Sequence, residues 1–207
     1  MVTWQQPGRQ VILASGSPRR RELLARMGIT FEVMTGGNVD EHSFIDAADL
    51  EGSLQRLALL KGEEPSHRIP AALVLSADTI VVYENSVLGK PGGRSEARAM
   101  LRLLSGRCHQ VFSAVALSCA EEAFTRSVVV STDVYFRSLS ASEIDWYLDT
   151  NEASDKAGAY GIQGSAMIFV DKIEGCFYNV VGLPVTGTIA LFEAFAARKD
   201  PPNVADN

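Results

Sequence analysis

The stretch LVLSADTIVVY, residues 73–83, constrains the fold more than any other part of the sequence. Its side chains are almost all apolar, which predicts a strand that is covered on both faces and lies inside a sheet. Asp78 interrupts this run near its centre. Because an unpartnered carboxylate is costly to bury, we expect Asp78 to meet a cation, a metal ion or several hydrogen-bond donors. A purely structural ion pair would satisfy the same requirement.

The order of the predicted elements indicates an α/β protein with a mixed sheet. Strands and helices alternate early in the chain, and the middle is rich in strands. The predicted strands cover residues 11–14, 31–34, 73–83, 109–118 and 127–136, and the first two predicted helices cover residues 18–27 and 48–61. The sequence contains no internal repeat and no linker, which predicts one domain over residues 1–199 and a polar tail over residues 200–207.

Local signals place the remaining elements. Ser95 is predicted to cap a helix, and Ser140 with Glu143 is typical of a capping box at the start of another. Residues 166–182 are predicted to form two strands joined by a tight turn. Pro184 is predicted to open the last helix.

Charge and cysteine usage exclude several classes of protein. The 207 residues carry a formal net charge of −6, which argues against nucleic acid or a membrane surface as a partner. The three cysteines are widely spaced, which excludes a disulfide framework and favours a reducing compartment. No apolar run approaches the ~20 residues that span a bilayer, and the first residues lack the pattern of a signal peptide. We therefore expect a cytoplasmic protein.

Three consecutive arginines, Arg19, Arg20 and Arg21, stand at the start of the first predicted helix. Ser17 and Pro18 are typical of the N-cap and of the first helical position. Cations at this end oppose the helix dipole, so helix stability alone would favour acidic residues there. A phosphate-binding site explains the arginines, and so does a solvated basic turn.

Two lysines and a second acid complete this group of polar residues. Lys61 falls on the apolar face of its predicted helix, although a lysine near a helix end can also extend its amine to solvent. Lys90 and Glu41 lie in predicted loops and indicate nothing alone. Together with Asp78, these residues supply the carboxylates and cations that metal-assisted phosphoryl or nucleotidyl chemistry requires. The chain has neither a P-loop nor a dinucleotide-binding glycine pattern, so it supports neither a Walker-type ATPase nor a dinucleotide oxidoreductase.

The same stretches, in the same order, resemble the Maf family of nucleoside triphosphate pyrophosphatases. The matching segments are LASGSPRRREL (13–23), VDE (39–41), RLALLK (56–61), VLSADTIVV (74–82), LGKP (88–91), LSGRCHQVFSAVAL (104–117), DKAGAYGIQG (155–164) and NVVGLPV (179–185). They cover nearly the whole chain, and AGAYGIQG is similar to the branch that acts on dTTP and UTP. Three places depart from the family's usual pattern: Ser76 replaces a glycine, Gly62 replaces an alanine, and the segment SAMIFVDKIEGCFY (165–178) is atypical in detail.

The resemblance implies the fold of inosine triphosphatases, a long mixed β-sheet flanked by helices with a cleft between two lobes. It implies hydrolysis of dTTP and UTP, and of modified pyrimidine nucleotides, to the monophosphate and pyrophosphate. It also implies Mg²⁺ or Mn²⁺ as cofactor and pairing as a homodimer.

The resemblance further assigns residues to the triphosphate site. These are Ser15, Arg20, Glu41, Lys61, Asp78 and Lys90. Asp78 would be the proton acceptor. A metal-bound carboxylate is a weak base, and we therefore favour Asp78 and Glu41 as ligands of the metal. Lys61, Lys90 and Arg20 would offset charge on the departing pyrophosphate.

Substrate choice is implied to depend on Arg19, Thr79 and Gln163. In the branch that acts on 7-methylguanosine triphosphate, these positions carry Trp, Gln and Glu. The residues present here suit a smaller, neutral pyrimidine base.

Two other functions remain open from the sequence. One is a nucleotide-sensing protein that binds a cell-division partner, because family members are connected with inhibition of septum formation. The pair of acids, Glu41 and Asp78, argues against a pure sensor. The other is a house-cleaning pyrophosphatase that acts on a different nucleotide.

Overall fold

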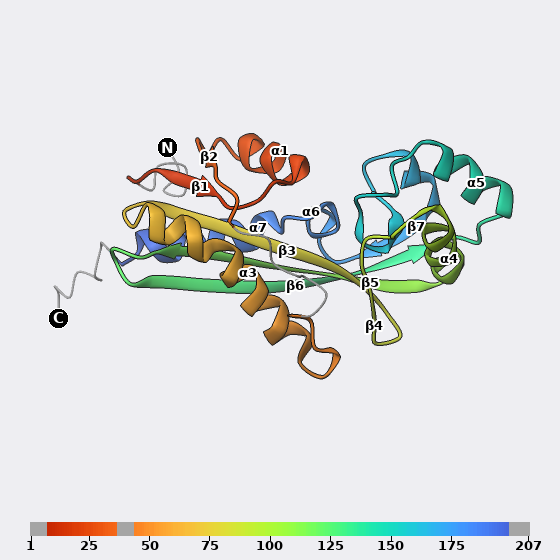
Figure 1. Cartoon of the computed structure of the whole chain (residues 1–207), viewed down its shortest axis with the longest axis horizontal. Helices are drawn as coiled ribbons and strands as arrows, with labels where there is room; N and C mark the ends of the chain where they lie inside the picture. Colours follow the sequence, from red (N-terminus) through yellow and green to blue (C-terminus); the bar gives the residue numbers. More distant parts are fainter. Residues whose placement is uncertain (1–7, 37–43, 199–207) are drawn as a thin grey trace, which may run out of the picture.

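A computed structural model describes residues 8–36 and 44–198, which form one seven-stranded sheet along the long axis of the molecule (Figure 1). The strand order is β2-β1-β3-β5-β6-β7, and β4 pairs with β3 off this path. β2, β1 and β3 are parallel, and the remaining pairs are antiparallel, so the sheet is mixed as predicted. The strands are β1 (Val11–Leu13), β2 (Glu32–Val33), β3 (Leu73–Tyr83), β4 (Ser86–Leu88), β5 (Cys108–Cys119), β6 (Phe124–Phe136) and β7 (Val170–Glu174).

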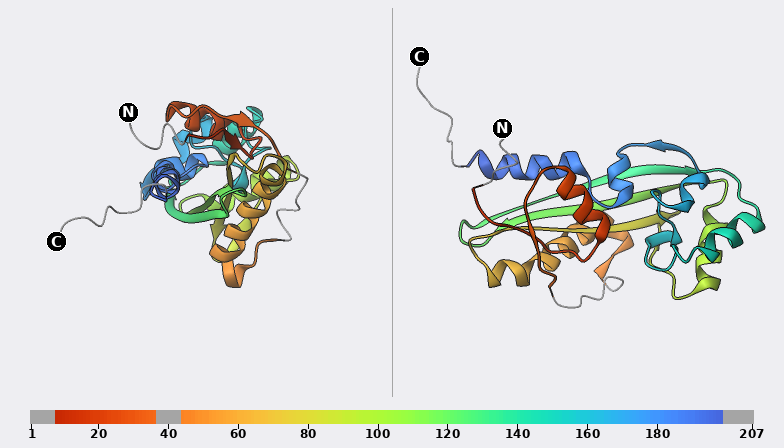
Figure 2. Two further views of the ribbon diagram at one scale, coloured as in Figure 1. Left: turned by 90° about the vertical axis from the view of Figure 1, so that its left-hand side faces the viewer. Right: turned by 90° about the horizontal axis from the view of Figure 1, so that it is seen from above.

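Helices flank both faces of this sheet, as Figure 2 shows from the end and from above. One face is covered by α3, and the other carries α6 and α7. α4 and α5 pack together at one end of the molecule, far from α1 (Figure 1). The α-helices are α1 (Pro18–Arg26), α3 (Leu50–Arg68), α4 (Arg94–Leu104), α5 (Ala141–Asp149), α6 (Phe177–Val181) and α7 (Val185–Ala196), and the 3-10 helices are η2 (Ala47–Asp49), η3 (Ala157–Ala159) and η4 (Ser165–Phe169). No helix in these ranges is long and apolar enough to cross a membrane.

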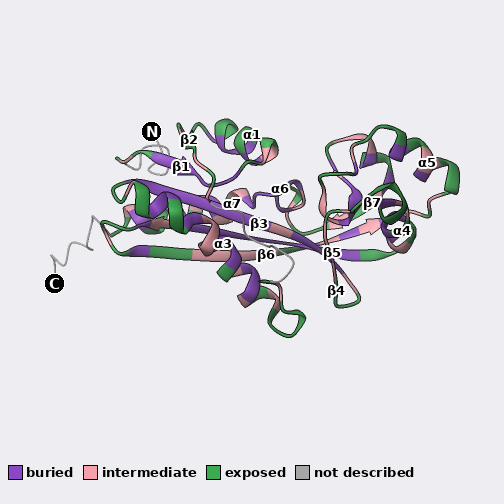
Figure 3. Ribbon diagram, viewed as in Figure 1, coloured by how far each residue is buried: buried purple, intermediate pink, exposed green. Residues whose placement is uncertain are grey.

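β3 is the central strand, and it is buried along most of its length (Figure 3). Because successive side chains of a strand point to opposite faces, its residues join apolar clusters on both sides of the sheet. Leu75 and Val81 belong to the large core under α1, α4 and α7. Ile80 and Val82 pack with Leu54 beneath α3. The apolar composition of the segment correctly predicted burial on both sides.

The edge of β3 opposite β5 is only partly covered. β1 pairs with β3 as far as Leu75, and β4 pairs with it from Val81 onward. Between these two points, no described strand covers the edge. α1, β1 and β2 stand on one side of this interval, and α4, α5 and β7 stand on the other (Figure 1). The shortness of β1 thus divides the molecule into two lobes joined by the long strands.

Several local predictions are confirmed, and two boundaries were missed. α5 begins with the capping box of Ser140 and Glu143, and α7 begins directly after Pro184. α3 continues to Arg68, past the predicted end at Lys61, and the short strand β4 was not predicted. The predicted limits of the domain and the tail over residues 200–207 lie outside the described residues.

The prediction that Ser95 caps a helix is wrong. α4 begins at Arg94, with Gly93 in the N-cap position, so Ser95 lies in the first turn. The carboxylate of Glu96 accepts a hydrogen bond from the backbone N–H of Gly92 at 2.7 Å. A glutamate in the first turn therefore binds the backbone that precedes the helix, as the glutamate of a capping box does, while no side chain caps the helix from the N-cap position.

The prediction of two strands over residues 166–182 is also wrong. Only β7 forms there, and the part predicted as a second strand is the short helix α6. Gly175 adopts φ +126°, which turns the chain out of the sheet. The side-chain amide of Asn179 then donates to the backbone oxygen of Val111 at 2.8 Å and to the hydroxyl of Thr132 at 3.0 Å. These contacts hold α6 across the face of β5 and β6, and no local pattern encodes them.

His109 is a buried histidine in β5, only 2% exposed. Its Nε2 lies 2.8 Å from the hydroxyl of Tyr160, and the edge of its ring packs against Phe136. Burial lowers the pKa of His109 to about 4, because the imidazolium form loses its hydration. The unfolded chain, where the pKa is near 6.5, therefore binds a proton at higher pH than the folded protein.

We expect this difference to make the protein acid-sensitive. Stability should fall as the pH drops from about 6.5 toward 4, by up to roughly 3 kcal/mol from His109 alone. His109→Gln keeps a polar partner for Tyr160 and should reduce this dependence. Urea unfolding at pH 7 and pH 5 measures the effect. His67→Gln, at an exposed histidine of α3, is the control and should respond to acid as the wild type does. An equal acid response in the His109 variant would contradict the assignment.

Candidate active site

A cleft of about 660 Å³ opens at the uncovered edge of β3, between the two lobes. The cleft confirms the expectation of a two-lobed molecule. Its lining comes mainly from residues 14–20 before and within α1, from the centre of β3, from residues 154–163 and from residues 180–182. Four segments that are far apart in the sequence therefore meet at the point where β1 ends.

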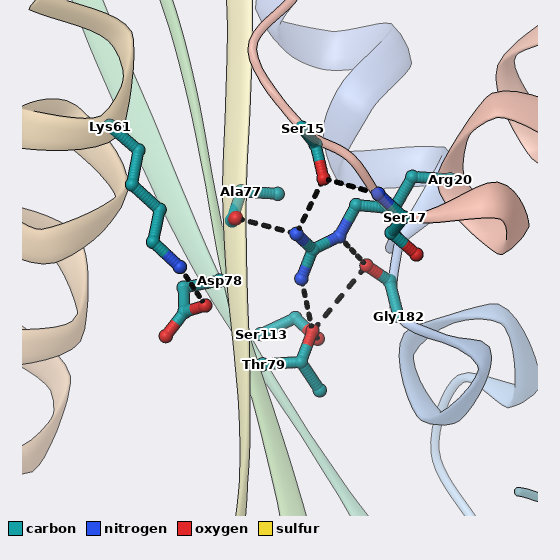
Figure 4. A network of polar contacts seen from close by, with 9 residues as sticks. All are labelled: Ser15, Ser17, Arg20, Lys61, Ala77, Asp78, Thr79, Ser113 and Gly182. Carbon is teal, nitrogen blue, oxygen red and sulfur yellow. Dashed lines mark hydrogen bonds and ion pairs between the residues drawn. The ribbon is translucent and has the colours of Figure 1, made fainter. Parts of the chain in front are cut away.

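Alternation along β3 separates two sets of polar contacts, which Figure 4 shows on either side of the strand. Asp78 points toward α3, where it meets Lys61. Thr79 points the other way, toward Arg20. The two sets line the same cleft.

Asp78 and Lys61 form a close ion pair. The Nζ of Lys61 lies 2.5 Å from Oδ1 of Asp78, and the two side chains are 17% and 8% exposed. This pair explains why a lysine occupies the apolar face of α3 and why a carboxylate can lie inside an apolar strand. Each charge removes most of the cost of burying the other, and removal of one partner alone leaves an uncompensated buried charge.

α3 approaches β3 closely one residue after Lys61. A Cβ atom on Gly62 would lie only 2.9 Å from Oγ of Ser76. Both positions were singled out in the sequence as departures from the pattern of the family it resembles. The serine side chain occupies the space that an alanine methyl on α3 would need. Gly62 and Ser76 therefore fit together where α3 packs on β3, next to the Lys61–Asp78 pair.

Arg20 is buried at the start of α1, although it is flanked by exposed Arg21. Within the described residues, its guanidinium donates four hydrogen bonds to neutral oxygens. The acceptors are the Gly182 backbone oxygen at 2.9 Å, the Ser15 hydroxyl at 3.0 Å, the Ala77 backbone oxygen at 2.7 Å and the Thr79 hydroxyl at 3.0 Å. Arg20 thus ties α1 to the uncovered edge of β3 and to the end of α6.

A chain of buried polar groups extends this network across the face of the sheet that α6 covers. The hydroxyls of Thr79 and Ser113 lie 2.8 Å apart, and Ser113 donates to the backbone oxygen of Asn179 at 3.2 Å. Asn179 is fully buried and is held in turn by Val111 and Thr132. The cleft wall formed by residues 180–182 is therefore fixed to the strands as well as to its own short helix.

The opposite wall is formed by the glycine-spaced segment 154–163. Within it, the Nζ of Lys156 lies 2.6 Å from Oδ1 of Asp155, and Arg19 approaches Oδ2 of the same carboxylate at 4.0 Å. The hydrogen bond from Lys156 is the largest influence holding the pKa of Asp155 below its usual value. Asp155 therefore stands between one cation of each lobe.

Gln163 and Lys90 are exposed and also line the cleft. Lys90 lies just after β4, and it borders a smaller adjoining cavity of about 210 Å³ together with Asp78 and Thr79. Both residues thus reach the cleft from the lobe opposite α1.

The structure brings together nearly all the residues singled out from the sequence. The cleft is lined by Ser15, Arg19, Arg20, Lys61, Asp78, Thr79, Lys90 and Gln163. Glu41 lies outside the described residues. Lys156 was missed as an individual residue, although it belongs to the glycine-spaced segment. Ser113 and Asn179 were also missed, and the one available signal was that both are polar residues among apolar neighbours.

The lining is electropositive, although the chain as a whole is acidic. Among the described residues of the lining, five cations face two carboxylates, and the cations are Arg19, Arg20, Lys61, Lys90 and Lys156. Such a local excess of positive charge in a concave site favours a polyanionic ligand.

The part of the chain that the structure describes contains no group of three or more histidine, cysteine or acidic residues that could hold a metal by itself. Asp78 is the carboxylate next to Lys61 in the cleft. Mg²⁺ is commonly bound by one or two carboxylates together with waters and substrate phosphates. The described residues therefore fit a metal ion that binds together with the phosphates of its substrate.

The sequence matches known proteins over most of its length. The family model described as "Maf-like protein" matches residues 10–195. A dTTP/UTP pyrophosphatase of Symbiobacterium thermophilum is 49% identical over 186 residues, which cover 90% of this chain and 94% of that protein. Proteins of the same name from Latilactobacillus sakei and Bacillus anthracis are 46% and 42% identical, with 84% and 90% of this chain and 94% and 96% of those proteins covered.

Among solved structures, the Staphylococcus aureus Ham1 protein matches 93% of this chain and 100% of its own, with 12% identity and a TM-score of 0.47.

The contact between Gly62 and Ser76 gives a test of the α3–β3 spacing. Gly62→Ala alone should destabilise the protein by about 1–3 kcal/mol, because the added methyl overlaps Oγ of Ser76. Combined with Ser76→Gly, it should cost less than the sum of the two single changes, with a coupling of about 0.5–3 kcal/mol. Urea unfolding of the four proteins measures this coupling. Additive effects would show that the two positions are independent.

Arg20 gives a second test. Arg20→Lys should destabilise the protein by about 2–4 kcal/mol, because an ammonium cannot reach four separated acceptors and leaves buried carbonyls without a donor. Arg21→Lys is the matched control, and at an exposed position it should change stability by less than about 0.5 kcal/mol. Thermal and urea unfolding measure both. Equal effects of the two substitutions would contradict the structural role of Arg20.

Proposed function

The chain belongs to the Maf family, and on that premise we propose that it is a nucleoside triphosphate pyrophosphatase that hydrolyses dTTP and UTP. The observation that carries this proposal is the electropositive cleft, in which the Lys61–Asp78 pair lies beside a further set of cations. The names of the relatives support the substrate: three of them, 42–49% identical, are called dTTP/UTP pyrophosphatase.

In the proposed reaction, water attacks the α phosphorus. A new P–O bond forms there, the bridging bond to the β phosphorus breaks, and the products are the monophosphate and pyrophosphate. The water's proton passes to a carboxylate or to solvent. No covalent intermediate is required.

Asp78 is the residue at the centre of this proposal. Lys61 holds its Oδ1 at 2.5 Å, which fixes the carboxylate at the edge of the cleft. Asp78, together with Glu41, would hold a divalent cation. Bound Mg²⁺ or Mn²⁺ would supply positive charge to the phosphate oxygens. Acceptance of the water's proton is the other role open to Asp78, and the metal role is favoured because a metal-bound carboxylate is a weak base.

The cations have separable tasks. Lys61 and Lys90 would neutralise charge that accumulates on the departing pyrophosphate. Arg20 keeps its positive charge in the cleft wall while its hydrogen bonds hold that wall together. We infer that it contributes to phosphate binding chiefly through its charge and by fixing Ser15.

Specificity would depend on Arg19, Thr79 and Gln163. The hydroxyl of Thr79 binds Arg20 and Ser113, so Thr79 acts as a positioning residue as well as part of the lining. Exposed Gln163 and half-buried Arg19 line the cleft from opposite lobes, which supports a contact of both with the nucleoside. A cytoplasmic location and a homodimer remain part of the proposal.

The proposal is tested by incubating the protein with dTTP or UTP and Mg²⁺ and measuring the nucleoside monophosphate and pyrophosphate formed. Asp78→Asn should lower kcat by at least ~100-fold, the scale of a lost acid–base or metal-binding group. Asp133→Asn, a strand carboxylate of β6 outside the cleft lining, is the matched control and should retain wild-type kcat. Thermal unfolding checks that both variants fold.

The same assay should favour dTTP and UTP over 7-methylguanosine triphosphate by about 1–3 kcal/mol in transition-state binding, the scale of one or two contacts in a pocket. Absence of pyrophosphate release from any nucleotide would refute the proposed activity. Near-wild-type turnover in the folded Asp78→Asn variant would refute the role of Asp78.

A further inference from the structure

Lys156 is a cation of the cleft to which neither the sequence motifs nor the proposed reaction assigns a role. It lies in the glycine-spaced segment between α5 and η4, on the lobe opposite α1. Its side chain is only 15% exposed, which is unusual for a lysine in an irregular segment.

Three contacts fix its side chain. The ammonium donates to the backbone oxygen of Glu152 and to Oδ1 of Asp155, both at 2.6 Å. The aliphatic part lies against Gly161, where an added Cβ would be 2.6 Å from Cε of Lys156. A side chain at position 161 would displace the end of the lysine, and the two hydrogen bonds of the ammonium hold it at the cleft wall in this structure.

The ammonium has one more N–H than it uses. A lysine has three donors, and two of them have acceptors within residues 8–36 and 44–198. A positioned cation with a remaining donor in a cleft is suited to an anionic oxygen of a ligand.

Asp155 links this lysine to the opposite lobe. Its Oδ1 binds Lys156, and its Oδ2 lies 4.0 Å from Arg19 at the mouth of α1. The two cations therefore converge from opposite walls on one small region of the cleft. Asp155 is largely exposed, so the charge of the two cations is only partly screened by it.

We propose that Lys156 is a further substrate-contacting residue, which binds a phosphate oxygen of the nucleotide from the lobe opposite Arg20 and Lys61. This inference rests on the proposed function, because it names a contact in the same site. It gives the segment 154–163 two tasks, a phosphate contact through Lys156 and a nucleoside contact through Gln163.

The competing role is purely structural, in which Lys156 only ties Glu152 to Asp155. The two roles differ in their dependence on charge and salt. Dissolved salt screens the attraction between a lysine and a phosphate. Loss of such a contact should therefore make the decrease of kcat/KM for dTTP with salt concentration shallower. A structural tie should leave that slope unchanged.

The experiment measures kcat/KM for dTTP in Mg²⁺ at several NaCl concentrations. Lys156→Met keeps the aliphatic packing on Gly161 and removes the charge, and it should lower kcat/KM by about 10- to 100-fold at low salt with a shallower salt slope. Lys156→Arg restores a positive charge and should recover most of the rate and the slope. Lys172→Met, which breaks a similarly spaced ion pair with Glu174 outside the cleft lining, should behave as the wild type.

An unchanged kcat/KM in Lys156→Met, or a loss with the wild-type salt slope that Lys156→Arg does not recover, would overturn the inference. If thermal unfolding shows that Lys156→Met is not folded, Lys156→Gln, which retains a donor for the Glu152 carbonyl, is judged by the same criteria. If the wild type is active and the Lys156 variants have the same kcat/KM, the phosphate contact of Lys156 is refuted and the proposed function stands. The proposed function fails when the wild type releases no pyrophosphate.

Discussion

The cleft depends on the burial of one guanidinium at the edge of β3. β1 ends early and leaves backbone groups of β3 without a neighbouring strand, and such groups need other partners when they are buried. The guanidinium of Arg20 donates a hydrogen bond to the backbone oxygen of Ala77. It also donates hydrogen bonds to Ser15, Thr79 and Gly182. Because a side chain takes the place of a strand, the edge of β3 stays open to a ligand while the Ala77 oxygen keeps a hydrogen-bond donor.

The two faces of β3 give the site its second constraint. A strand sends neighbouring side chains to opposite sides, so Asp78 and Thr79 cannot share a partner in the same layer. Asp78 is paired by Lys61 of α3, and Thr79 joins the network of Arg20. The Lys61–Asp78 ion pair and the hydrogen bonds of Arg20 thus reach one cleft from opposite sides of β3. The precision of both depends on the spacing between helices and sheet, as the contact between Gly62 and Ser76 illustrates.

The glycines of the segment 154–163 also follow from packing rather than from flexibility. A Cβ on Gly158 would lie 3.0 Å from Val81, and one on Gly161 would overlap Lys156. Gly158 also adopts φ +65°, which favours glycine. The segment is therefore pressed against β3 on one side and filled by its own lysine on the other. This close fit fixes the path of the segment that carries Lys156 and Gln163 to the cleft.

The sequence by itself determined the central strand, the mixed α/β class and most of the polar residues of the cleft. Those predictions succeeded because a buried charge such as Asp78 stands out against an apolar run, and because the family resemblance covers nearly every motif. The capping box at Ser140 was equally predictable, since its contacts span only three residues.

Only the tertiary structure decided the rest. Arg20 is buried while Arg21 is exposed, and Lys61 is the partner of Asp78. The residues after Gly175 form a helix instead of a strand. The partners that decide these features are distant in the sequence. Lys61 and Asp78 are 17 residues apart, and Asn179 and Val111 are 68 residues apart. Local propensity cannot encode such partners, because they exist only after the chain has closed on itself.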